Sequence, residues 1–148
     1  MSQYQQILVP VDGSKISLSA VKKAAQLAVA FNSKLTLVSL VAEDPFSNAD
    51  FYYSASIMRD YFVQAYENAE KALVEAAQVA KDVGVEASTE VVKGLVSAEG
   101  VVATATQYNA DLIVMGSHGR KGFQKVLLGS FAQDVLSNTE LPVLIVKA

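Results

Sequence analysis

The sequence predicts a single α/β domain in which helices cover a mostly parallel β-sheet. Short, continuous apolar runs, typical of strands buried on both faces, alternate with longer segments whose apolar residues recur every three or four positions. This β-α-β-α-β-α-β-α-β order requires right-handed crossovers between parallel strands. With 148 residues, 51% of them hydrophobic and 18% charged, the chain is expected to form one compact domain over residues 1–148.

The first strand and helix are predicted near the N-terminus. Residues 7–11 form an apolar run, and Pro10 is expected near its C-terminal end because proline cannot donate to a sheet ladder. Residues 18–31 carry apolar side chains at helical spacing, with Ser14 near the expected helix start. Asn32 stands where a left-handed C-cap residue is expected.

The middle of the chain predicts a strand, a loop and a helix. Residues 35–41 form the second apolar strand, and residues 43–55 show no period and are interpreted as a loop. Helical spacing returns over residues 62–83 and stops at Gly84. Few strong breakers precede this segment, so the helix could begin as early as Ser54.

The C-terminal half predicts three strands and two helices. Ser97 is expected to cap a helix whose apolar positions span residues 101–108. The Ser-Phe-Ala-Gln run over residues 130–133 matches a capping box that opens a short helix. The strands are predicted at residues 85–92, 112–115 and 143–146.

Charge and composition exclude several classes of function. The formal net charge of −3 provides no general attraction to nucleic acid or to anionic lipid. The absence of cysteine excludes disulfides, thiolate metal sites and thiol catalysis. No apolar run approaches the roughly 20 residues needed to cross a bilayer, and the N-terminus lacks the basic segment of a secretory signal. We therefore expect a cytoplasmic protein that binds neither nucleic acid nor membranes.

Glycines cluster after the fourth predicted strand. The sequence is Gly-Ser-His-Gly over residues 116–119 and Gly-Ser over residues 129–130, and residues 117–128 carry three basic side chains and no carboxylate. Glycine lets the backbone approach an anion closely, and a helix start offers unpaired N–H groups together with a positive dipole end. The segment therefore predicts a phosphate site, and with it a nucleotide-binding protein.

Other residues leave more than one interpretation open. Neither the G-x-x-x-x-G-K-[ST] phosphate loop nor the G-x-G-x-x-G dinucleotide fingerprint occurs. Asp12 can accept hydrogen bonds from ribose hydroxyls, bind a metal ion, or close an Asx-turn. His118, the single histidine, fits a loop residue or a phosphate contact better than a catalyst or metal ligand. Six aromatic residues could stack on a base or pack in the core or an interface: Phe51, Tyr52, Tyr53, Tyr61, Phe62 and Tyr66.

These motifs resemble the universal stress protein family. Residues 116–130 match its nucleotide loop, G-x2-G-x9-G-[ST]. Residues 7–14 resemble its first strand and loop, and residues 141–146 resemble its last strand. The three motifs occur in the family's order and span essentially the whole chain. Two positions depart from common family patterns, with Ser39-Leu40 in place of His-Val and Gly94-Leu95-Val96 in place of G-x-P.

The resemblance implies a three-layer, Rossmann-like fold with a five-stranded sheet of order 3-2-1-4-5. It also implies a homodimer through residues 143–147 and an ATP site that takes Mg²⁺ with the nucleotide. Pro10 and Asp12 would line the adenosine, with Asp12 on the ribose, and Leu40 and Met115 would lie against adenine. The residues implied around the phosphates are Gly116, Gly119, Arg120, Gly129, Ser130 and Phe131, and Ser117 and His118 within the glycine pattern complete the predicted set.

Three functions are compatible with these observations. The first is an ATP-binding stress protein that acts as a nucleotide-linked regulator of stress response and survival. The second is a dimeric interaction module that needs no nucleotide, against which the intact glycine pattern speaks. The third is a slow ATPase. Efficient hydrolysis needs a base and charge stabilisation at the γ-phosphate, and the chain offers no good base beyond Asp12 or His118.

Overall fold

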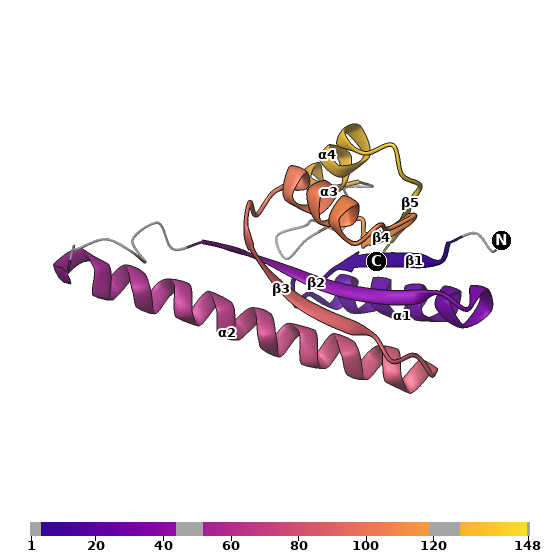
Figure 1. Cartoon of the computed structure of the whole chain (residues 1–148), viewed down its shortest axis with the longest axis horizontal. Coiled ribbons are helices and arrows are strands. Elements are labelled where there is room, and N and C mark those ends of the chain that lie inside the picture. The colour runs from indigo at the N-terminus through magenta and orange to yellow at the C-terminus, as the bar shows by residue number, and fades with distance from the viewer. Residues whose placement is uncertain (1–3, 44–51, 119–127, 148) are drawn as a thin grey trace.

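The computed structural model describes residues 4–43, 52–118 and 128–147, with the backbone alone for residues 52–58. Within this part of the chain, five strands form one parallel sheet in the order β3-β2-β1-β4-β5, which confirms the predicted order (Figure 1). The strands are β1 (Gln6–Pro10), β2 (Lys34–Ala42), β3 (Ser88–Gly94), β4 (Leu112–Gly116) and β5 (Val143–Val146). The helices are α1 (Lys15–Phe31), α2 (Tyr52–Val83), α3 (Ala98–Gln107) and α4 (Ser130–Asn138). None of these described helices is both long and apolar enough to cross a membrane.

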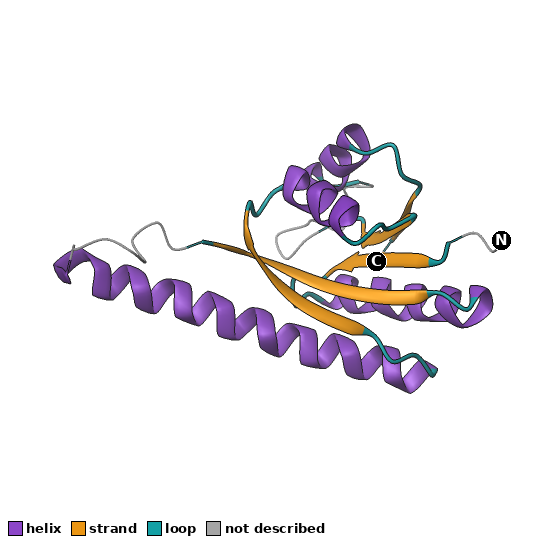
Figure 2. Ribbon diagram, viewed as in Figure 1, coloured by secondary structure: helices purple, strands orange, loops and turns teal. Residues whose placement is uncertain are grey.

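Helices cover both faces of the sheet (Figure 2). Helices α1 and α2 pack on one face, where Val9, Leu37 and Val114 belong to a single core cluster. Helices α3 and α4 pack on the other face, where Leu8 and Ile113 belong to a second cluster. Side chains of a strand alternate between faces, so a strand covered on both sides must be apolar at nearly every position. This requirement explains the continuous apolar runs in the sequence.

Helix α2 begins earlier and β3 begins later than the sequence predicted. Residues 52–55, interpreted as loop, are helical, and residues 44–51 lie outside the described part. At the other end of α2, Gly84 has a φ of 109°, and the N–H of Val85 donates to the carbonyl of Ala80 at 3.0 Å. This pattern is a Schellman motif, in which the two residues after the helix satisfy its last carbonyls. Val85 therefore closes α2 rather than opening the strand.

Serine and asparagine cap the helices as predicted. The Ser14 hydroxyl accepts the N–H of Ser17 at 3.2 Å, and Asn32 ends α1 with a φ of 55°. The Ser97 hydroxyl accepts the N–H of Gly100 at 3.3 Å and caps α3. These bonds satisfy amide groups that have no partner within their own helix.

Replacing Ser97 by alanine is expected to lower the free energy of unfolding by about 1 kcal/mol, because the substitution removes the N-cap acceptor of α3. Urea denaturation followed by circular dichroism measures this change. Ser19→Ala is the control, since Ser19 is an exposed residue inside α1 whose hydroxyl bonds only to the carbonyl of Lys15. An equal loss in the two variants would contradict the capping role.

Candidate nucleotide site at the β1–β4 edge

The strand order reverses between β1 and β4. These neighbours run parallel, with Ile7 opposite Leu112 and Leu8 opposite Ile113. The chain continues outward from β1 to β2 on one side and from β4 to β5 on the other. Open α/β sheets bind ligands beyond the carboxyl ends of strands at such a switch point. The loops that follow β1 and β4 therefore both start at the carboxyl end of the sheet, where a ligand is expected.

Asp12 follows β1 and forms the Asx-turn considered from the sequence. Pro10 is the last residue of the strand, as predicted. Atom Oδ1 of Asp12 accepts the backbone N–H of Ser14 at 2.9 Å and also the Ser14 hydroxyl. Gly13 between them has a φ of 82°, which glycine adopts without strain. The Asp12 side chain is exposed, so the turn holds a carboxylate at the carboxyl end of β1 and leaves it accessible to solvent.

Backbone hydrogen bonds join the two ends of the glycine segment after β4. Ser117 is 2% exposed, and its N–H donates to the carbonyl of Val146 at 2.9 Å. Its carbonyl accepts the N–H of Gly129 at 2.7 Å. A Cβ on Gly129 would lie 3.0 Å from this same carbonyl oxygen, tighter than nine in ten real Cβ contacts. A side chain at position 129 would therefore push this backbone contact apart by a few tenths of an ångström.

Gly116 makes a second close approach, to helix α1. A Cβ at this position would lie 3.0 Å from Cγ1 of Ile16 and 3.3 Å from the carbonyl oxygen of His118. The end of β4 thus passes directly over the first turn of α1. Sequence reasoning did not single out Ile16, because nothing in its local pattern distinguishes it from other apolar helix residues.

Helix α4 starts at the carboxyl end of the sheet without a capping side chain. Gly129, with a φ of −71° and a ψ of 161°, is the N-cap, and Ser130 is the first helical residue. The predicted capping box is therefore wrong by one residue, and the Gln133 amide instead donates to the carbonyl of Leu128 at 2.9 Å. The exposed Ser130 and Phe131, the latter 38% exposed, form the start of the helix. An N-terminus without a side chain in front of it leaves room for an anion at the positive dipole end.

Comparisons with known proteins show the family of this chain. Residues 3–147 match the sequence profile of the Universal stress protein family. The chain belongs to this family. Universal stress protein MJ0531 of Methanocaldococcus jannaschii is 35% identical over 144 residues, which cover 97% of this chain and 82% of that protein. The structure of universal stress protein UspA from Lactobacillus plantarum superposes with a TM-score of 0.82 over 99% of both chains, at 24% identity.

A third relative has a nucleotide in its solved structure. The crystal structure of a universal stress protein in complex with cAMP is 32% identical, has a TM-score of 0.74 and covers 98% of both chains. Universal stress proteins similar to this chain thus include at least one that binds an adenine nucleotide.

The two apolar residues that the family resemblance placed at adenine lie on the α3–α4 side of the sheet. Leu40 is partly buried against that core, and Met115, 4% exposed, belongs to it and pairs in register with Ile145. Ser39, at the position where the family resemblance leads us to expect histidine, is buried. Because Met115 is a core residue, only a ligand that entered from the strand end would reach it.

The remaining residues considered from the sequence differ in their positions. His118 is half-buried immediately after the Ser117 contact, whereas Gly119 and Arg120 lie outside the described residues. Tyr66 belongs to α2, on the opposite face of the sheet from Leu40, and its ring lies 5.0 Å below the Lys93 ammonium group. Within the described ranges, no three acidic or histidine side chains are grouped to hold a metal ion.

Proposed function

We propose that this universal stress protein binds ATP, together with Mg²⁺, beyond the carboxyl ends of β1 and β4. The supporting observation is the hydrogen bond from the N–H of Gly129 to the carbonyl of Ser117, which places the uncapped start of α4 at these strand ends. The first-turn N–H groups of α4 would bind phosphate oxygens. The relative that binds cAMP supports an adenine nucleotide as the ligand.

In this proposal Asp12 is a ribose acceptor. A carboxylate facing phosphate repels it, whereas ribose hydroxyls can donate to the carboxylate oxygens. The adenosine would therefore lie toward Pro10, Asp12 and Leu40, and the phosphates toward residues 129–131. A magnesium ion would take most of its ligands from phosphate oxygens and water, as Mg²⁺ does in many nucleotide sites.

We also propose that the chain works as a nucleotide-linked regulator through a homodimer. Strand β5 ends the described sheet on one side and is hydrogen bonded within it to β4 alone, which leaves its other edge available to a second copy. The N–H of Ser117 donates to Val146 on β5, so the proposed nucleotide site and the proposed dimer strand share a backbone contact. ATP at 100 times its dissociation constant would stabilise the bound state by about 2.7 kcal/mol.

Two variants separate the ribose role of Asp12 from its turn role. Asp12→Ala is expected to weaken ATP binding about tenfold, equivalent to about 1.4 kcal/mol, because it removes the ribose acceptor. Ser14→Ala removes the hydroxyl partner and the cap of α1 but leaves the carboxylate, so it should lower the stability and change the affinity little. Isothermal titration calorimetry with ATP and Mg²⁺ measures both affinities.

The same titration tests the alternatives. If the two variants lost affinity equally, Asp12 would act through the turn rather than through ribose. If the wild-type protein bound no nucleotide, a nucleotide-independent interaction module would replace the proposal. Release of phosphate from bound ATP measures hydrolysis, which we expect to be slow at most.

A further inference from the structure

Strand β3 forms the other edge of the sheet, and helix α2 lies beneath it (Figure 1). In the described sheet β3 pairs with β2 alone. Every second residue of such a strand directs its N–H and C=O groups away from the sheet, where they can pair with another chain. Natural proteins usually cover, shorten or charge such an edge.

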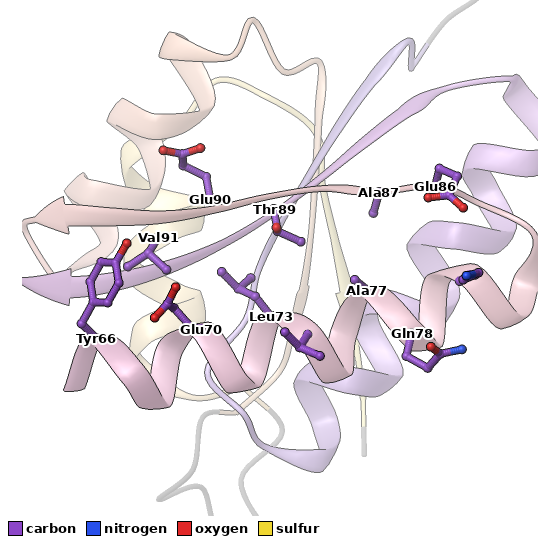
Figure 3. A pocket seen from close by; sticks show the side chains of 12 residues that line it. Tyr66, Glu70, Leu73, Ala77, Gln78, Glu86, Ala87, Thr89, Glu90 and Val91 are labelled. Atoms are coloured by element: carbon purple, nitrogen blue, oxygen red, sulfur yellow. The ribbon is translucent and has the colours of Figure 1, made fainter. Parts of the chain in front are cut away.

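A hollow of about 470 Å³ lies between α2 and this edge (Figure 3). The side chains of Thr89 and Val91 point from β3 toward α2, and Glu70 points from α2 toward β3. Val74, 72% exposed, contributes an apolar surface from the helix. The helix thus forms a floor beside the open edge, on which a further strand can lie.

Carboxylates outnumber ammonium groups around this edge of β3. Glu70, Glu86 and Glu90 line the hollow, against a single lysine, Lys81. The side chain of Glu90 points to the opposite side of β3 from Val91. Burial, and secondarily this carboxylate, raises the pKa of Tyr108, the C-cap residue of α3. The nearby ammonium group of Lys93 lies over the ring of Tyr66. An added strand would therefore meet a carboxylate on one face and Val74 on the other.

We propose that the edge of β3 binds an extended segment of a partner protein in which basic and apolar residues alternate. The backbone of the segment would pair with β3, as in other cases of strand addition to a sheet edge. Its basic side chains would lie beside Glu90 on the α3 side, and its apolar side chains would lie over Val74 in the hollow. Cross-strand pairs of opposite charge stabilise this kind of pairing.

In one register, charge also opposes a second copy of this chain at the same edge. Two copies related by a two-fold axis through Ser88, the first residue of β3, would place Glu86 of each chain opposite Glu90 of the other. Like charges directly opposite each other destabilise strand pairs. A basic partner would meet attraction at Glu90 in place of this repulsion.

A short acetylated peptide of alternating lysine and valine is the probe, and fluorescence anisotropy of its labelled form measures binding. The wild-type chain should bind it saturably. The double variant Glu86→Lys with Glu90→Lys should bind it about tenfold more weakly, because attractive pairs become repulsive. Glu140→Lys, an exposed substitution in the turn before β5, changes the net charge as much as Glu86→Lys or Glu90→Lys alone, and it should change the affinity little.

Two altered peptides test the pairing itself. Methylation of alternate backbone nitrogens, or arrangement of the same lysines and valines in two blocks, should abolish binding. Undiminished binding of either peptide would overturn the proposal, as would failure of the wild-type chain to bind the original peptide. The proposal would also be overturned by a wild-type dimer in sedimentation experiments whose dissociation constant the Glu90→Lys substitution changes. None of these experiments requires a nucleotide, so their outcome is independent of the proposed ATP site.

Discussion

Replacing Gly129 by valine is expected to lower the ATP affinity at least about tenfold, a change of about 1.4 kcal/mol. Even a Cβ at this position would lie 3.0 Å from the carbonyl oxygen of Ser117, and the branched side chain adds further atoms. The backbone would have to move apart by at least a few tenths of an ångström, which weakens the 2.7 Å hydrogen bond that positions the start of α4. Calorimetry with ATP and Mg²⁺ measures the affinity, and circular dichroism confirms that the variant is folded.

Ser130→Ala is the matched comparison for this variant. It removes a hydroxyl from the first residue of α4 but leaves the backbone N–H groups in place. Its loss of ATP affinity should therefore be clearly smaller than that of Gly129→Val. A larger loss in Ser130→Ala would show that the hydroxyl, and not the backbone approach, determines phosphate binding.

Replacing Gly100 by alanine is expected to lower the free energy of unfolding by about 3 kcal/mol. Gly100 is a buried residue in the first turn of α3, and a Cβ there would lie 2.0 Å from the backbone carbonyl oxygen of Leu95. Because this neighbour is backbone, the chain entering α3 would have to shift as a whole. Helix propensity alone predicts the opposite sign, a gain of roughly 0.8–1 kcal/mol.

Urea denaturation of Gly100→Ala and of Thr106→Ala decides between these expectations. Thr106 lies in the same helix and is exposed, so alanine there should change the stability little. A Gly100→Ala variant as stable as the wild-type protein would mean that Leu95 can move away at little cost. The close approach of the two segments would then not be a constraint on the fold.

Sequence patterns predicted the elements that are buried on both sides. The apolar runs of β1 and β4 fit strands that are covered on both faces, because every side chain of such a strand is buried. Pro10 fits a strand end, because proline cannot donate to the sheet ladder. Asn32 was recognised because a left-handed residue after an amphipathic segment satisfies the last carbonyls of a helix. At the candidate site, the glycine spacing pointed to the segment that the Ser117–Gly129 bond closes.

The remaining features depend on contacts between distant residues. Val85 has the properties of a strand residue but closes α2, because its N–H reaches Ala80. Ser130 matches a capping box, yet Gly129 takes the cap position where the backbone must pass close to Ser117. No local pattern marks Gly100, since a glycine within helical spacing gives no sign of a neighbouring carbonyl. The hollow beside β3 arises from how α2 lies against the sheet edge, which no local pattern encodes.

The most direct test is a titration of isotope-labelled protein with ATP and Mg²⁺, followed by amide resonances in NMR spectra. Binding at the proposed site predicts saturable shifts at Asp12, at residues 116–118 and at residues 128–132, with little change along β3 and the facing side of α2. Saturable shifts confined to the β3–α2 hollow, or no shifts in a folded protein, would contradict nucleotide binding beyond the carboxyl ends of β1 and β4.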